Sequence, residues 1–262
     1  MQTFLINLDR SPDRLAFMQE QADRMGIAFE RIPGVDGAAN VPQWMQPQFE
    51  DTPLTSGEIG CYASHLVCAR RIVEDCLDYA LVLEDDVTLQ EDFTTIARRS
   101  IAKAPTGWDY IHLSSHIKRA VVHVADLSGS RILIRHTRLP VNTAAYILSN
   151  AGARKWLKPR PRVRPNDMDV RYGWIYDLDI YGVYPSPASQ ENNFISDIGG
   201  TNNPFHKEAK HNWSPGMMSR FHGEYWQVKK IGVGNTVRAR LANIANSLRR
   251  KIGGERRVSI LK

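Results

Sequence analysis

Apolar runs and helical periods alternate in the first part of the chain. Phe4–Leu8 is a short apolar run that predicts a buried strand. A Ser-Pro pair then marks a helix start, because serine caps helix N-termini and proline costs no hydrogen bond at the first helical position. We expect that helix to end at Gly26, since glycine readily takes the left-handed conformation there, and a second strand to cover Ile27–Ile32. This β-α-β opening predicts parallel strands.

The same patterns predict the remaining elements. Strands are expected at Ala80–Leu83, Tyr110–Leu113, Ala144–Leu148 and Ile180–Tyr184, with a hairpin over Val121–Ile134. Helices are expected at Gly57–Cys76 with Ser56 as its cap, Phe93–Lys103, Asn150–Leu157 and Asp167–Leu178. Residues 38–55 predict a loop, and residues 186–228 a mostly irregular part. The alternation predicts an α/β sandwich with a mostly parallel sheet, which binds ligands at the carboxyl ends of its strands.

The C-terminal part differs from the rest in charge. Residues 229–262 hold ten Lys and Arg residues and one acid, whereas the whole chain has a formal net charge of +6. The body is therefore slightly acidic, and the basic character belongs to the tail. We divide the chain into a body, 1–228, and a basic tail, 229–262. Apolar positions of the tail recur at steps of three or four, which predicts an amphipathic helix: Val233, Val237, Leu241, Ile244, Leu248 and Ile252.

The tail helix has two interpretations. Either the helix lies on an anionic membrane surface, or it packs on the body with its basic face in solvent. Nucleic acid is not expected as a partner, because the tail lacks interleaved aromatic residues that stack on bases. No apolar run approaches the length of about 18 residues that spans a membrane. The N-terminus lacks signal-peptide features, so we expect a cytoplasmic protein, peripheral on the inner face of the membrane if the tail binds lipid.

Three acids follow the most apolar predicted strand. Ala80–Leu83 ends abruptly in Glu84, Asp85 and Asp86. Adjacent carboxylates at a buried strand end repel one another, and a divalent cation that prefers hard oxygen ligands would resolve the conflict. In nucleotide-sugar chemistry such a metal bridges the diphosphate and stabilises the departing nucleotide. The alternative is a solvated acidic turn that only caps the next element.

Four segments carry a resemblance to a known family. They are Phe4–Arg14 (FLINLDRSPDR), Ser56–His65 (SGEIGCYASH), Leu81–Leu89 (LVLEDDVTL) and Asn142–Leu157 (NTAAYILSNAGARKWL). Together and in this order they resemble glycosyltransferase family 25, the group of bacterial lipooligosaccharide glycosyltransferases and procollagen galactosyltransferases. The resemblance extends over about residues 1–198 and weakens toward the end of that range. The combination is specific, whereas each segment alone is a weak signal.

The resemblance implies a GT-A-like, Rossmann-type sandwich that moves a hexose, galactose or glucose, from a nucleotide-sugar donor, often a UDP-hexose, with inversion. It implies Mn²⁺ or Mg²⁺ as cofactor. The implied acceptor is a saccharide or lipid-linked saccharide, such as a lipopolysaccharide or lipooligosaccharide core. The alternative is a catalytically silent relative that acts as a binding module. A phosphotransferase or nucleotidyltransferase is disfavoured, because that class uses a Gly-rich phosphate loop, which the chain lacks.

The residues after the first strand are candidate donor ligands. They face the same strand-end crevice as the acids. Arg10 or Arg14 would meet the diphosphate, and Asn7 or Asp9 would meet uracil or ribose. For Arg14, the alternative is that it belongs only to the first turn of the helix.

Glu58 and His65 are two further donor-site candidates, both in the second matched segment. Glu58 is alternatively a cap favoured by the helix dipole, and His65 alternatively orients the acidic motif or a phosphate. Among the acids, we expect Asp86 to bind the metal directly. Glu84 and Asp85 are expected to be shared between metal, ribose and structural hydrogen bonds.

The catalytic base is sought in a second acidic pair. An inverting transferase needs a carboxylate to take the proton of the acceptor hydroxyl, and metal-bound acids are poor candidates. Asp167 and Asp169 lie on one side of an extended backbone but would diverge by about 200° on a helix. We favour Asp167; Asp169 and Asp197 stay open, and a capping role is the alternative. The resemblance implies that Gln190 closes over the donor, and the alternative is that it only satisfies loop backbone.

Overall fold

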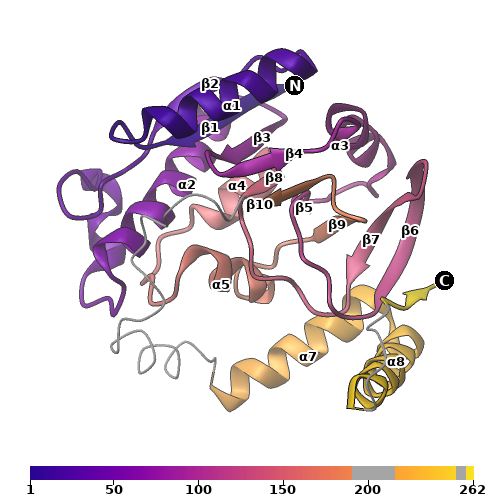
Figure 1. Cartoon of the computed structure of the whole chain (residues 1–262). Helices are drawn as coiled ribbons and strands as arrows, with labels where there is room; N and C mark the ends of the chain where they lie inside the picture. The colour runs from indigo at the N-terminus through magenta and orange to yellow at the C-terminus, as the bar shows by residue number, and fades with distance from the viewer. Residues whose placement is uncertain (191–215, 252–257) are drawn as a thin grey trace.

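The computed structural model describes residues 1–190, 216–251 and 258–262. In Figure 1 the first strands and helix of the chain and the C-terminal helices lie at opposite ends of the molecule. The chain opens with the β-α-β unit that its sequence predicts: β1 (Gln2–Asn7), α1 (Pro12–Met25) and β2 (Glu30–Pro33), with β1 and β2 parallel.

The first helix ends as expected but begins differently. Gly26 follows α1 with a φ of 63°, which is the left-handed conformation predicted for it. Ser11 precedes the helix, but its side chain makes no capping hydrogen bond. The start of α1 therefore relies on the fixed φ of Pro12 rather than on a serine cap.

Nine strands of the described chain form one sheet. Their order is β11-β6-β7-β9-β5-β8-β3-β1-β2. The strands not yet introduced are β3 (Tyr79–Glu84), β5 (Tyr110–His112), β6 (Val121–Ser128), β7 (Arg131–His136), β8 (Ala145–Ser149), β9 (Ile180–Tyr184) and β11 (Ile260–Leu261). Their pairings make seven strands run in one direction and β7 and β8 in the other. The sheet is therefore mostly parallel, as predicted.

Helices cover both faces of the sheet. The core on one face includes residues of α2 (Ser56–Glu74), α4 (Asn150–Trp156) and α5 (Asn166–Arg171), and the core on the other includes residues of α1 and α3 (Phe93–Lys103). Neighbouring residues of β1 join different cores, because strand side chains alternate between faces. The predicted α/β sandwich is therefore confirmed.

Two predicted boundaries in the first third of the chain are wrong. The predicted loop at 38–55 contains a 3₁₀ helix, η1 (Gln43–Phe49). The cap of α2 is Thr55 rather than Ser56, because Thr55 accepts from the Glu58 backbone while the Glu58 side chain accepts from the Thr55 backbone. This reciprocal capping box satisfies two backbone N–H groups and fixes where α2 begins.

Two further differences lie toward the C-terminus. The predicted helix Asp167–Leu178 is shorter: α5 ends at Arg171, and the 3₁₀ turn η2 (Gly173–Ile175) follows. A separate two-stranded sheet pairs β4 (Val87–Leu89) with β10 (Ala188–Gln190) in antiparallel fashion, so the acidic motif continues directly into a strand held by the segment before residue 191.

The C-terminal part holds two helices, α7 (Met217–Ile231) and α8 (Val233–Lys251). α7 falls in the part predicted to be irregular, and it continues across residue 228, where the tail was expected to begin. Four of its large apolar residues face solvent, Met217, Met218, Phe221 and Tyr225, each at least 63% exposed, whereas Trp226 and Ile231 are buried. Figure 1 shows α7 and α8 together at one end of the molecule.

The predicted tail helix α8 packs on the body through its small and polar residues. Ala239 is buried against Ala120 and Leu261, and the Ala120 N–H donates to Asn243 Oδ1 at 3.0 Å. The apolar stripe from Val233 to Leu248 points away, with each of its five residues at least 52% exposed. The tail helix thus packs on the body with its basic residues Arg238, Arg240 and Arg249 exposed, as one of its two interpretations predicts, but the contact is not made by the apolar stripe. In the described residues, no helix is both long and apolar enough to cross the bilayer.

A close approach of backbones joins α2 to the turn after β2. An ideal Cβ on Gly60 would lie 2.4 Å from the Val35 carbonyl oxygen and 2.9 Å from the Gly37 nitrogen. Both are backbone atoms, which cannot move aside as a flexible side chain can. Glycine at position 60 therefore lets the N-terminal turns of α2 lie directly on the segment that follows β2.

We expect Gly60→Ala to lower the free energy of unfolding by about 1–3 kcal/mol, the usual cost of forcing extra volume into a packed site. The measurement is urea unfolding followed by circular dichroism. Gly234→Ala is the matched control, because that helical glycine has no heavy atom within 4 Å of its ideal Cβ. Alanine there should leave stability unchanged or raise it by up to about 1 kcal/mol. Equal effects of the two substitutions would contradict the close-contact explanation.

Candidate active site

The three parallel strands β1, β2 and β3 end at one cavity of about 210 Å³. Its lining includes Asn7 after β1, Gly34 after β2, and Glu84, Asp85 and Asp86 at the end of β3. The N-terminal half of α2 closes another side of it. The predicted donor-site residues that line the cavity are Asn7, Arg10, Arg14, His65, Glu84, Asp85, Asp86 and Gln190. The acids therefore lie at the strand-end crevice that the sequence predicts.

Asp85 is the acid that ties the ends of β1 and β3 together. Asn7 Nδ2 donates to its Oδ2 at 2.7 Å, and Arg14 Nη1 lies 3.1 Å from its Oδ1. Burial raises the pKa of Asp85, and the hydrogen bonds from Asn7 and Arg14 offset part of that rise. Both carboxylate oxygens are engaged, so Asp85 has a structural part at this strand end. Arg14 does more than complete the first turn of α1, since it neutralises this buried acid.

Glu84 is held from a different side by a buried chain of polar groups. His65 Nε2 lies 3.1 Å from Glu84 Oε1, and the Tyr146 hydroxyl lies 2.9 Å from His65 Nδ1. Because a carboxylate only accepts, Nε2 carries the hydrogen, and the tyrosine hydroxyl donates to Nδ1 when the ring is neutral. Thr143 Oγ1 donates to the same Glu84 oxygen at 3.0 Å. His65 thus orients the acidic motif, which was one of its two predicted roles.

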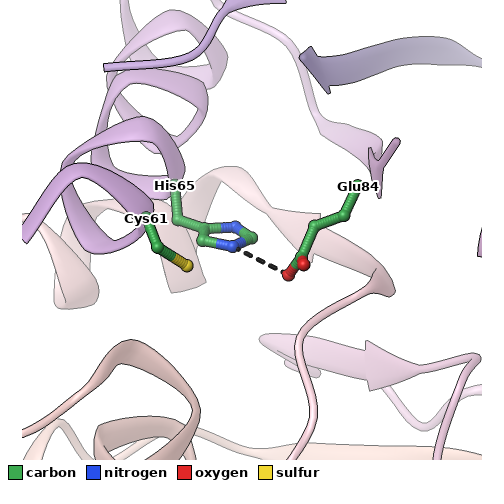
Figure 2. A group of neighbouring side chains, drawn as sticks. All are labelled: Cys61, His65 and Glu84. Carbon is green, nitrogen blue, oxygen red and sulfur yellow. Dashed lines mark hydrogen bonds and ion pairs between the residues drawn. The ribbon is translucent and has the colours of Figure 1, made fainter. Parts of the chain in front are cut away.

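The Glu84 carboxyl is kept ionised by these contacts. Burial acts to raise its pKa, but the His65 hydrogen bond and charge, the Thr143 hydroxyl and the charge of Arg14 together hold the pKa below its ordinary value. Figure 2 shows the His65 ring between Cys61 and Glu84, with the hydrogen bond drawn. Glu84 therefore contributes a fixed negative charge to the cavity.

Asp86 is the acid with unused bonding capacity. Gln190 Nε2 donates to its Oδ2 at 2.8 Å, whereas its Oδ1 is buried and has no hydrogen-bond partner. Burial and the neighbouring charge of Glu84 raise the pKa of Asp86 to about 7. A buried carboxylate oxygen without a donor is costly, and a cation supplied by the ligand would remove that cost.

These residues fit a hard divalent cation at Asp86 better than a softer site nearby. Ligand atoms of Cys61, His65 and Glu84 lie within 4.8 Å of one another. However, both ring nitrogens of His65 are already engaged, and burial raises the Cys61 pKa well above its ordinary value, which disfavours the thiolate. Mn²⁺ and Mg²⁺ prefer carboxylate oxygens, so the open oxygen of Asp86 suits them.

Two predicted donor residues lie at the rim rather than in the interior. The Asp9 side chain is 84% exposed and pairs with Arg31 Nη2 at 2.5 Å. Arg31 also donates from Nε to Asn7 Oδ1 at 2.9 Å, so it braces the end of β1. Arg10 lines the cavity from its edge, with Nη1 3.6 Å from Asp36 Oδ2. Arg10 is therefore placed to meet an anion that enters the cavity, whereas Asp9 points to solvent.

Glu58 has the structural role that was the alternative for it. Its side chain completes the capping box with Thr55 and is buried. It does not line the cavity, and its charge reaches the site only at a distance, where it raises the pKa of Asp167.

The two acids of the second pair separate on α5. Asp169 is buried, and its Oδ2 accepts from the hydroxyls of Tyr62 at 2.9 Å and Tyr176 at 2.8 Å. Its Oδ1 lies 3.5 Å from Arg164 Nη1. These contacts hold Asp169 in the core. Asp167 points in a different direction, because side chains two residues apart diverge on a helix. This placement speaks against Asp169 as a base that meets an acceptor hydroxyl.

Asp167 is partly exposed and lies within the field of the active-site acids. Burial, followed by the charges of Glu84 and Glu58, raises its pKa to about 6, against a backbone hydrogen bond from Met168 that lowers it. A carboxyl with a pKa near neutrality is suited to accept and return a proton. Asp197, the third candidate base, lies outside the described residues.

The sequence model of glycosyltransferase family 25, described as an LPS biosynthesis protein, matches residues 1–168. The chain belongs to glycosyltransferase family 25. The matched part contains the acids at the end of β3, His65 and Asp167, whereas Gln190 and the C-terminal helices lie beyond it.

Curated relatives match between 60% and 72% of the chain. Procollagen galactosyltransferase 1 of Danio rerio is 32% identical over 178 residues, which are 61% of this chain and 29% of that protein. A glycosyltransferase 25 family member of Anopheles gambiae is 30% identical over 175 residues, 60% and 28% of the two chains. An inactive glycosyltransferase 25 family member 3 of Mus musculus is 28% identical over 218 residues, 72% and 36%. This family 25 chain thus spans about a third of the length of such relatives.

Solved structures are more distant. The galactosyltransferase LgtC, in complex with donor and acceptor sugar analogues, is 10% identical with a TM-score of 0.36, covering 85% of this chain and all of that one. A glycosyltransferase involved in glycosylation of the PBCV-1 major capsid is 8% identical with a TM-score of 0.36, covering 81% and 97%. Scores this low do not by themselves define a common fold.

Sequence reasoning missed several residues that build the family 25 site. Tyr146 and Thr143 come from the start of β8 and reach Glu84 only through the antiparallel placement of that strand. Arg31 braces Asn7 from the neighbouring strand, and Ser64 Oγ accepts from the Val35 N–H at 2.8 Å. A usable signal existed for two of them, since Thr143 and Tyr146 lie in the fourth matched segment.

Proposed function

We propose that this family 25 protein transfers a hexose, galactose or glucose, from a nucleotide-sugar donor to a saccharide acceptor, with inversion at the anomeric carbon. The observation that carries the proposal is the buried, unpartnered oxygen of Asp86 at the strand-end cavity, with Arg10 and Arg14 beside it. The divalent cation that accompanies a diphosphate would neutralise Asp86, and the two arginines would bind the negatively charged diphosphate oxygens. Galactose is favoured among hexoses by the name of the Danio rerio relative.

In this proposal Asp86 holds Mn²⁺ or Mg²⁺, and Glu84 adds negative charge from its fixed position beside His65. The cation, when bound, neutralises the charge that develops on the leaving nucleotide. Asn7, held rigidly by Arg31 and Asp85, would line the nucleoside side of the cavity, and Gln190 would position Asp86 through its hydrogen bond.

The acceptor side of the proposal rests on Asp167. Its carboxylate takes the proton of the attacking hydroxyl, and the oxygen of that hydroxyl forms the new bond to the anomeric carbon as the nucleotide leaves. We propose a lipopolysaccharide or lipooligosaccharide core, or another lipid-linked saccharide, as acceptor, because the matched family model is described by LPS biosynthesis. The second candidate function is that of a catalytically silent binding module, because the Mus musculus relative is named inactive.

A ligand-binding prediction separates the hexosyltransferase from the silent binding module. UDP with Mn²⁺ should raise the melting temperature of the full chain, since ligand at 100 times its dissociation constant stabilises a protein by about 2.7 kcal/mol. Asp86→Asn should abolish the Mn²⁺-dependent part of that shift, whereas Asp126→Asn, a 90% exposed acid on β6, should retain it. Hydrolysis of UDP-galactose by the wild type would exclude the silent module. No stabilisation by UDP with or without Mn²⁺ would refute the donor-site proposal.

Another prediction concerns the pH dependence of the transfer rate. Because Asp167 must be ionised to accept a proton and its pKa is about 6, kcat/KM should rise with pH up to about 6 and level off above. Asp167→Asn should lower kcat by about 100-fold or more and remove this acidic limb. Asp177→Asn, an exposed acid beyond α5, should keep both the rate and the limb. An unchanged pH profile in Asp167→Asn would show that another group is the base.

We also propose that α7 and α8 bind an anionic membrane surface, where lipid-linked saccharides are found. Both helices carry large exposed apolar residues, and the basic residues Lys229, Arg238 and Arg240 are exposed as well, a combination that suits anionic lipid headgroups.

The membrane proposal predicts that the full chain floats with vesicles containing anionic lipid and much less with neutral vesicles. The triple substitution Phe221→Ser, Leu241→Ser and Ile244→Ser should abolish flotation without changing the circular dichroism spectrum, because all three side chains are more than half exposed. Equal recovery of the wild type with neutral and anionic vesicles would overturn the proposal.

A further inference from the structure

A basic groove lies beside the active site, on elements that the donor cavity does not use. It consists of two adjoining cavities of about 350 and 420 Å³, which share Arg138, Leu139 and Arg171. The first cavity adds Lys118 and Arg119 from the segment between β5 and β6, and the second extends to α7. We call these residues together the cationic groove: Lys118, Arg119, Arg138, Leu139 and Arg171.

The basic residues of the cationic groove form no ion pair within the described residues. In the described part of the chain, no carboxylate lies within ion-pair distance of Lys118, Arg119, Arg138 or Arg171. The acid that lines the second cavity, Glu224, is already paired with Arg240. Burial and the nearby charge of Arg171 lower the pKa of Arg138. Two guanidinium groups held together in this way repel each other, and an anionic ligand would relieve that repulsion.

The cationic groove is connected to the active site by two short paths. Arg171 lies four residues after Asp167 on α5, which puts both side chains on the same face of the helix. Residues 139–141 line the groove, and the next two residues reach the donor site: Asn142 Nδ2 lies 3.5 Å from Gln190 Oε1, and Thr143 donates to Glu84. A ligand that contacts Arg171 would therefore lie about one helical turn from the proposed base.

We propose that the cationic groove binds a phosphate group carried by the acceptor saccharide. The inference rests on the proposed transferase function, since it assigns the acceptor side of the same site. Arginine forks match the oxygens of a phosphate in bidentate fashion, and several of them around one cavity suit a doubly charged group. Held there, the phosphate would fix the position of the saccharide so that one of its hydroxyls meets Asp167.

The test uses the full chain with saturating UDP and Mn²⁺, so that the donor cavity is filled. Titration calorimetry compares glucose 6-phosphate with glucose. We expect the phosphorylated sugar to bind at least tenfold more tightly, and the double variant Arg138→Gln, Arg171→Gln to raise its dissociation constant about tenfold or more, as loss of charged hydrogen bonds does. The control Arg24→Gln, Arg98→Gln removes two exposed arginines on α1 and α3 and should leave binding unchanged.

The outcomes separate this inference from the proposed function. UDP binding that persists in the groove variant, together with loss of glucose 6-phosphate binding, supports the inference. Equal affinity of the wild type for both sugars while UDP still binds overturns it and leaves the donor-site proposal standing. Loss of vesicle flotation in the groove variant, without any glucose 6-phosphate binding by the wild type, would also overturn it, because lipid headgroups would then occupy the groove.

Discussion

Three adjacent carboxylates at the buried end of β3 are the constraint around which the rest of the site is built. Each accepts hydrogen bonds from a different direction: Asp85 from β1 and α1, Glu84 from α2 and the segment before β8, and Asp86 from β10. Like charges this close are tolerated only when separate partners hold them. The motif therefore fixes the relative positions of five elements, and the residual unsatisfied oxygen falls at the place where a ligand enters.

The sequence was informative where local pattern and burial agree. The run before Glu84 predicted a central strand, and Gly26 predicted the end of α1, because each depends on nearest neighbours alone. The contact of Thr143 with Glu84 and that of Tyr146 with His65 were not predictable in this way, since they depend on β8 running opposite to β3. Glu58 shows the converse: its position at a helix start favoured a cap and a site residue equally, and only the Thr55 hydrogen bonds decide for the cap.

The C-terminal helices show how an apolar pattern misleads when it faces outward. The stripe of α8 was found from its period, but a period does not say which side the body occupies. In the structure, Ala239 and Asn243 contact the body while Leu241 and Ile244 remain in solvent. α7 was missed for the same reason, because Phe221 and Tyr225 have no core to fill. α8 thus packs through small contacts and α7 through Trp226 and Ile231, which leaves the other large side chains of both helices available for another surface.

The direction of β8 has one more consequence. Because this strand enters the sheet at the active-site edge, the chain arrives there from β7 through a short segment, residues 137–144, pinned at several points. Thr137 donates to the Ala120 carbonyl, Asn142 accepts from Ser114 at 2.6 Å, and the Ala144 carbonyl accepts from the Glu84 N–H at 2.8 Å. A tether fixed at both ends acts as a spacer of constant length between the cationic groove and the acids. Such a spacer, rather than contacts with the sugar, would then set which hydroxyl of a bound saccharide lies next to the anomeric carbon of the donor hexose.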